Sequence, residues 1–160
     1  IEKVPEVTKP YKYLYESLRE FNGSFNSPPI FLTGRVGWEN MAQEVARVYG
    51  QIPEEEREGC GIAADNYAAA GAVDQYALKY GLPNAVSGML TYYLWGPGEN
   101  WGPMIFLTER SNSMSYFYDQ CELKSSAPFL FMSSRTMSIY VCRGLNTPKE
   151  EIWKSAKIYY

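Results

Sequence analysis

The chain has 160 residues and a formal net charge of −3, with 46% hydrophobic and 21% charged residues. This length suits one compact domain, which can bury roughly 70% of the surface that its unfolded chain exposes. The balanced charge offers no basic surface, which argues against nucleic-acid binding. Because the chain contains no histidine, catalytic triads and zinc sites that depend on histidine are excluded.

No apolar run approaches the roughly 20 residues that a membrane-spanning helix needs, and no signal-peptide pattern is present. The chain starts at Ile1 rather than Met, so we expect a piece excised from a longer protein, although processing or tag removal would also account for it. Its three cysteines, Cys60, Cys121 and Cys142, predict neither a disulfide framework nor a metal pair. Cys60 and Cys142 lie in strand-like apolar runs, where a buried thiol behaves as a small hydrophobe.

The N-terminal residues 1–29 are expected to form a linker and a helix that packs on the domain. Apolar residues recur at helical spacing over 11–21 and predict an amphipathic helix there. Residues 30–160 are then expected to form a single α/β domain, in which 30–33 is a short strand or the start of the next unit. A second amphipathic pattern predicts a helix over 38–49, with Gly50 as its C-terminal cap.

The rest of the chain alternates between strand-like and helix-like segments. Strands are expected over 30–33, 59–65, 84–87, 103–108, 120–123 and 138–142, and helices over 53–56, 68–80, 111–118 and 148–158. This alternation predicts an α/β fold with three layers, in which helices flank both faces of a mostly parallel sheet of Rossmann-like or flavodoxin-like topology. Thr147, Pro148 and Glu150 fit a capping box at the start of the last helix.

Ligands of such sheets bind at the carboxyl ends of the strands. Three segments are expected to meet at that edge: 65–67, 87–95 and 108–110. Their candidate ligand-binding residues are Asn66, Tyr67, Ser87, Tyr92, Tyr93, Trp95 and Glu109. For Asn66 the competing interpretation is a helix cap. No catalytic residue, metal site or cofactor can be named, because no carboxylate pair or phosphate-binding loop has the required spacing.

The segment 88–103 is the most distinctive part of the chain. It holds four large aromatic residues between turn-forming glycines and prolines, which predicts a loop or a short broken helix. Aromatic side chains in such a loop can form a contact surface for a ligand, or they can pack the loop onto the sheet. The sequence alone leaves both interpretations open.

A set of short motifs, taken in order, carries a family resemblance. They are Gly37-Trp-Glu39, Cys60-Gly-Ile-Ala63, Asn66-Tyr67, Ala70-Gly-Ala72 with Asp74, Tyr80-Gly-Leu-Pro83, Ser87-Gly88, Tyr92-Tyr-Leu-Trp-Gly-Pro97 and Val141-Cys-Arg-Gly144. Over roughly residues 30–156 the chain resembles the soluble C-terminal domain of integral-membrane glycosyltransferases similar to family 39. That group contains protein O-mannosyltransferases and lipid A aminoarabinose transferases.

The resemblance implies a role outside the bilayer. Enzymes of the family transfer a sugar from a polyprenyl-phosphate carrier, and their catalytic acids belong to the membrane-embedded part. The chain is therefore expected to be a non-catalytic extracytoplasmic accessory domain, tethered by segments absent from it. Its expected partners are the membrane-embedded portion of the same polypeptide and a glycan, a polyprenyl-phosphate sugar or an acceptor.

The chain departs from the family pattern at two places. Ala68-Ala69 and Met89-Leu-Thr91 stand where relatives tend to have polar residues, so the expected cleft has fewer hydrogen-bonding groups. This favours an apolar ligand, a protein contact or a structural role. Two alternatives remain: a carbohydrate- or lipid-phosphate-binding module that uses loop 88–103, and a small free-standing α/β enzyme.

Overall fold

The computed structural model describes residues 37–110, 113–127 and 136–158. The predicted helix over 11–21, the linker around it and the strand over 30–33 lie outside these residues. In chain order the elements are α4 (Trp38–Gly50), α5 (Glu54–Arg57), β1 (Gly61–Ala64), α6 (Tyr67–Tyr80), β2 (Ala85–Val86), α7 (Thr91–Leu94), β3 (Met104–Thr108), the 3₁₀ helix η2 (Ser113–Tyr116), β4 (Tyr118–Ala127), β5 (Met137–Leu145) and α8 (Lys149–Ser155).

The strands form one five-stranded sheet in the order β2-β1-β3-β5-β4. Strand β1 pairs in parallel with β2 on one side and with β3 on the other, whereas β5 pairs antiparallel with both β3 and β4. Among these described strands, β5 is therefore the one that runs against the rest. The α/β fold with a mostly parallel sheet is confirmed.

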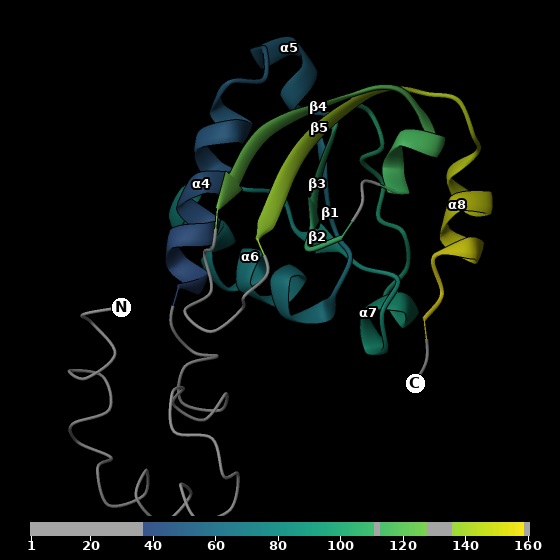
Figure 1. The fold of residues 1–160 in the computed structure, drawn as a ribbon, viewed down its shortest axis with the longest axis horizontal. Helices are drawn as coiled ribbons and strands as arrows, with labels where there is room; N and C mark the ends of the chain where they lie inside the picture. Colours follow the sequence, from purple (N-terminus) through teal and green to yellow (C-terminus); the bar gives the residue numbers. More distant parts are fainter. Residues whose placement is uncertain (1–36, 111–112, 128–135, 159–160) are drawn as a thin grey trace, which may run out of the picture.

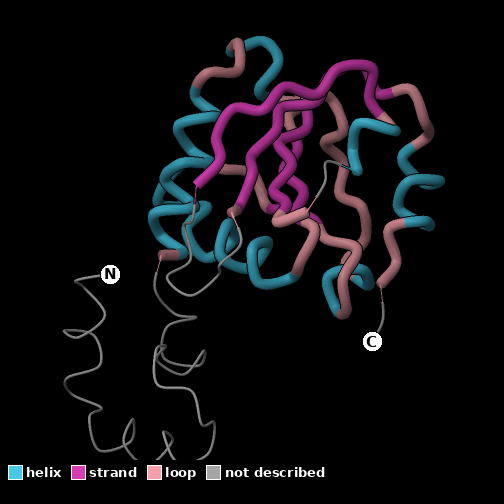
Figure 2. Tube along the Cα trace, viewed as in Figure 1, coloured by secondary structure: helices cyan, strands magenta, loops and turns pink. Residues whose placement is uncertain are grey.

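Helices cover both faces of the sheet, as Figure 1 shows, with α4 and α6 on one side and η2 and α8 on the other. The side chains of β3 alternate between the two faces: Ile105 and Leu107 pack with α4 and α6, whereas Met104 and Phe106 pack with η2 and α8. All five residues of β3 are buried, as expected of a central strand covered on both faces. Figure 2 shows the central strands between helices, with the edge strand β4 along the outside of the sheet.

Several predicted boundaries differ from the structure. Strand β4 is longer than the predicted 120–123 and begins at Tyr118, so the helix predicted over 111–118 is reduced to η2. The capping box is absent, because α8 starts at Lys149 without a side-chain cap and the Thr147 hydroxyl donates to Asn146 instead. Gly50 is the last residue of α4 rather than its cap.

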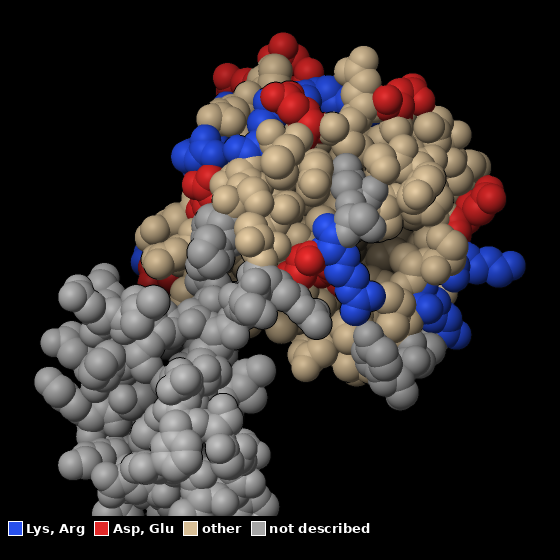
Figure 3. Space-filling model, viewed as in Figure 1, with Lys and Arg blue, Asp and Glu red and all other residues tan. Residues whose placement is uncertain are grey.

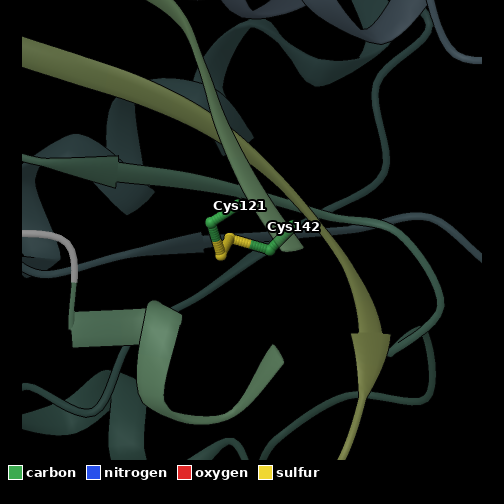
Figure 4. Close-up of a disulfide and its surroundings, with 2 residues drawn as sticks. All are labelled: Cys121 and Cys142. Carbon is green, nitrogen blue, oxygen red and sulfur yellow. A yellow bond between two sulfur atoms is a disulfide. The ribbon is translucent and has the colours of Figure 1, made fainter. Parts of the chain in front are cut away.

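Cys121 and Cys142 form a disulfide between β4 and β5 (Figure 4). The antiparallel register places these two residues directly opposite one another, although they are 21 residues apart in sequence. The interpretation of Cys142 as a free thiol is therefore wrong. Cys60 remains a buried free cysteine, in agreement with its interpretation as a small hydrophobe.

Candidate functional site

Polar groups at the carboxyl ends of β1 and β3 form one hydrogen-bonded network. The Asp65 carboxylate accepts from the Thr108 hydroxyl at 2.8 Å, from the Glu109 backbone N–H at 3.0 Å and from the Asn66 amide at 2.9 Å. The Thr108 hydroxyl also accepts from the backbone N–H of Arg110 at 2.9 Å. These bonds join the two central parallel strands where each one ends. Asp65 therefore has a structural role: its carboxylate links the ends of β1 and β3.

Asn66 is the N-cap of α6. Its side-chain oxygen accepts from the backbone N–H of Ala69 at 2.8 Å, while its amide nitrogen donates to Asp65. This bond satisfies one of the backbone donors left free at a helix N-terminus. The cap interpretation of Asn66 is confirmed, and both ends of its amide are occupied within the domain.

Beside this network lies the carboxyl-edge crevice, a hollow of about 310 Å³ between the sheet, η2 and α8. Its lining includes Ala64, Asp65, Ser87, Phe106, Met114 and Trp153. In the sheet, β1 lies between β2 and β3. The chain passes from β1 to β2 on one side and then crosses to β3 on the other side, so the crevice lies at the topological switch point of the parallel strands. Ser87 is buried, and its hydroxyl accepts from the Met89 backbone N–H at 3.3 Å.

The C-terminal segment closes over the loop that follows β2. Met89 and Ile158 form a parallel bridge, with backbone bonds from Ile158 to Gly88 at 2.9 Å and from Leu90 to Ile158 at 3.1 Å. A Cβ at Gly88 would lie 2.0 Å from the carbonyl oxygen of Ala156, so this approach requires glycine. Leu90 has a φ of 55° and a ψ of −132°, a conformation that a leucine adopts at a cost of about 1–3 kcal/mol.

A second hollow, the Trp95 groove, lies along the edge strand β2 and has a volume of about 410 Å³. Its lining includes Asp74, Asn84, Tyr92, Trp95, Glu99 and Asn100. Gly96 and Gly98 both have positive φ, at 90° and 68°, and turn the loop sharply on either side of Pro97. The Trp101 indole donates to the Pro97 carbonyl at 2.7 Å and holds this turn in place.

The aromatic residues of segment 88–103 separate into buried and exposed groups. Tyr92 is 8% exposed, and Tyr93 stacks on Trp153 with ring centres 5.2 Å apart. Trp101 is buried on the face of the sheet that η2 and α8 cover, whereas Trp95 is 70% exposed. Packing therefore explains most of the aromatic run, and Trp95 is the member left at the surface beside a hollow.

Asp74 fixes the inner wall of the Trp95 groove. Its carboxylate accepts from the Ala85 backbone N–H at 2.7 Å and from the Tyr92 hydroxyl at 2.8 Å. Burial and this bond raise the pKa of Tyr92 above its ordinary value. The Tyr92 ring in turn meets Trp95 edge to face, with ring centres 4.5 Å apart. The Asp74 side chain on α6 thus binds both the edge strand β2 and the short helix α7.

The sequence-predicted residues are thus divided between places. Ser87 lines the crevice, while Tyr92 and Trp95 line the groove. Tyr67 is exposed at the start of α6 and lines neither hollow, and the Glu109 backbone joins the Asp65 network. Sequence reasoning missed Asn84, Glu99 and Asn100, because isolated polar residues in turns give no signal of a shared groove.

Charged groups are mixed over the surface, as Figure 3 shows for one face, with acidic side chains gathered over α5. Glu39 pairs with Lys79 and accepts from Tyr80 at 2.9 Å, and these bonds lower the pKa of Glu39. Within the described ranges, no group of three metal-ligating side chains lies together, and no helix has the length and apolarity to cross a bilayer.

Comparison with known proteins gives no match: no family model, curated protein or solved structure is similar to this chain. The site must therefore be interpreted from its own geometry.

Proposed function

We propose that this chain is a non-catalytic extracytoplasmic accessory domain of a membrane-embedded glycosyltransferase that uses a polyprenyl-phosphate sugar. In this role it assists recognition of the substrate or acceptor. The observation that carries the proposal is the state of the carboxyl edge. There the Asp65 carboxylate and the Asn66 amide are both hydrogen-bonded within the domain, so that, among the described residues of this edge, these two groups support the fold.

The assignment to a glycosyltransferase rests on the ordered motifs described above. Several of them fall at structurally important positions, which supports their use as a fold signature. Asp74 holds β2 and α7, Gly88 permits the approach of the C-terminal segment, and Asn66 caps α6. The membrane anchor would come from other segments of the same polypeptide.

The disulfide supports a location outside the cytoplasm. Disulfides form and persist in oxidising compartments and are rare in the reducing cytosol. The Cys121–Cys142 bond joins two strands of the sheet, whereas Cys60 stays a buried thiol. In protein isolated and unfolded without a reductant, a maleimide should label Cys60 and should label Cys121 and Cys142 only after reduction. Labelling of Cys121 and Cys142 before reduction would contradict the extracytoplasmic assignment.

The gene containing Ile1 provides the first test, because it should encode several apolar membrane helices in the same reading frame. The second test uses that full-length protein in membrane vesicles, with sugar transfer from a polyprenyl-phosphate donor as the assay. Asp65→Asn and Glu109→Gln should change the turnover rate by less than about threefold, since neither residue does chemistry. Deleting residues 37–158 should mainly raise the KM for donor or acceptor. A turnover rate that falls by about 100-fold or more in Asp65→Asn would contradict the non-catalytic role.

A further inference from the structure

The Trp95 groove has the size of a small-molecule site. Its volume of about 410 Å³ lies in the lower part of the roughly 300–1,000 Å³ range of ligand pockets. It lies beside the edge strand β2, away from the carboxyl-edge crevice, and its walls come from the starts of β1 and β2, from α6 and from loop 95–100.

Trp95 presents a held aromatic surface to this groove. Large aromatic residues are usually buried, yet 70% of Trp95 is exposed. Its ring is supported by the edge-to-face contact with Tyr92, whose hydroxyl donates to Asp74. A ring that is held before binding loses little conformational entropy when a ligand stacks on it.

The polar groups of the groove suit hydroxyl groups. Asn84 and Glu99 are exposed at the groove, and neither makes a hydrogen bond in the part of the chain that the structure describes. The Asn100 amide donates to the Cys60 carbonyl at a long 3.4 Å. A carboxylate accepts hydrogen bonds from hydroxyls, and amides can both donate and accept.

The charge of the groove argues against an anionic ligand. Among the described residues that line it there is no lysine or arginine, while Asp74 and Glu99 both contribute carboxylates. A phosphate would meet these like charges without a compensating cation. The ligand chemistry is therefore neutral, polyhydroxylated and apolar on one face.

We propose that the Trp95 groove binds a neutral pyranose ring, which stacks its C–H face on Trp95 and directs hydroxyls to Asn84, Glu99 and Asn100. Such a ring combines C–H groups of partial positive charge with hydroxyls around its rim, and the face of an aromatic ring is negative. This assignment deepens the proposed recognition role and rests on it. It places the recognised part of the substrate in the sugar rather than in the phosphate or the lipid.

The test measures binding of three neutral sugars to the 160-residue chain by saturation-transfer difference NMR. The probes are methyl α-mannopyranoside, methyl β-glucopyranoside and N-acetylglucosamine, each up to about 20 mM, since a dissociation constant on the order of 1 mM is expected for so small a ligand. Trp95→Ala should weaken binding at least about tenfold. The matched control is Leu94→Ala, because Leu94 is the preceding residue, is also 70% exposed and does not line the groove.

Each outcome decides the assignment. Binding of at least one sugar that Trp95→Ala abolishes and Leu94→Ala leaves within about twofold supports it. No binding of any of the three sugars overturns it. Equal losses in both variants also overturn it, because they indicate contact through an exposed apolar patch. Displacement of the sugar by inorganic phosphate overturns the neutral assignment. The sugar-transfer assay on the full-length protein does not depend on the NMR binding test. A failed binding test therefore removes the sugar site, whereas a failed transfer assay removes the accessory role.

Discussion

The carboxyl edge and the Trp95 groove use similar residue types for different purposes. At the carboxyl edge, Asp65, Asn66 and Thr108 bond to one another and to the backbone, so their polarity stabilises the fold. At the groove, Asn84 and Glu99 face solvent beside an exposed Trp95. The difference shows that a polar residue at the end of a strand indicates a ligand only when its hydrogen bonds are not already satisfied.

The largest expected effect comes from Asp65→Ala. This change removes the acceptor of three hydrogen bonds and leaves the buried Thr108 hydroxyl without its carboxylate partner. The free energy of unfolding should fall by about 4 kcal/mol. Urea unfolding provides the measurement. Asp65→Asn is the matched control, since it keeps an oxygen toward Thr108 and should lose about 1 kcal/mol. Equal losses of stability in the two variants would contradict the structural role of the Asp65 hydrogen bonds.

Gly88→Ala tests how tightly the C-terminal segment closes beside the crevice. The added Cβ would lie 2.0 Å from a backbone oxygen, so the bridge between Met89 and Ile158 must open, at a cost of about 3 kcal/mol. Gly59→Ala is the control, because a Cβ there meets nothing within 4 Å. Thermal unfolding of the two variants should differ clearly. A stable Gly88→Ala protein with normal exchange protection at Ile158 would show that the segment does not pack there.

Two Tyr→Phe substitutions sharpen the contrast between satisfied and unsatisfied hydroxyls. Tyr92→Phe removes the bond to Asp74 that holds the groove wall and should destabilise the protein by about 2 kcal/mol. Tyr118→Phe removes a buried hydroxyl that has no hydrogen-bond partner among the described residues, and it should stabilise by about 1 kcal/mol. Denaturant unfolding measures both. Effects of the same sign would contradict this account.

The smallest expected effect is a loss of stability in alkali. Burial raises the pKa of the Cys60 thiol from 9.0 to about 12, so the folded state holds this proton more tightly than the unfolded state. The resulting stabilisation is complete below pH 9 and is lost as the pH rises toward 12. At about pH 10 the loss should be about 1 kcal/mol. The control is Cys60→Ala, unfolded below pH 9 and at about pH 10. Between these two pH values its free energy of unfolding should decrease by about 1 kcal/mol less than that of the unsubstituted protein.

Much of the fold can be predicted from local pattern. The apolar runs that form β1 and β3, and the periodic segments that form α4 and α6, are recognisable because burial imposes their spacing. The disulfide escapes such a prediction because it depends on the pairing of β4 with β5, although each of the two predicted strands contains one cysteine. Pairing between strands is a tertiary property that local periodicity does not encode.

The candidate site is harder to predict. Trp95 stands out in the sequence, but its exposure beside the buried Tyr92 depends on which side of the short helix α7 faces the core. Asp74 lies within a predicted helix, where side chains commonly contact residues three or four positions away. It instead reaches residues 11 and 18 positions away in sequence, and such contacts follow from helix packing rather than from spacing.

The central claim is that recognition occurs at the Trp95 groove and that the carboxyl edge is structural. Backbone amide NMR during titration with methyl α-mannopyranoside, methyl β-glucopyranoside and N-acetylglucosamine tests it most directly. For a sugar that binds, the account predicts shifts at residues 84–86 and 95–100 and unchanged signals at Asp65, Ser87 and Thr108. Shifts concentrated at Asp65, Ser87 and Thr108, or none anywhere with any of the three sugars, would contradict it.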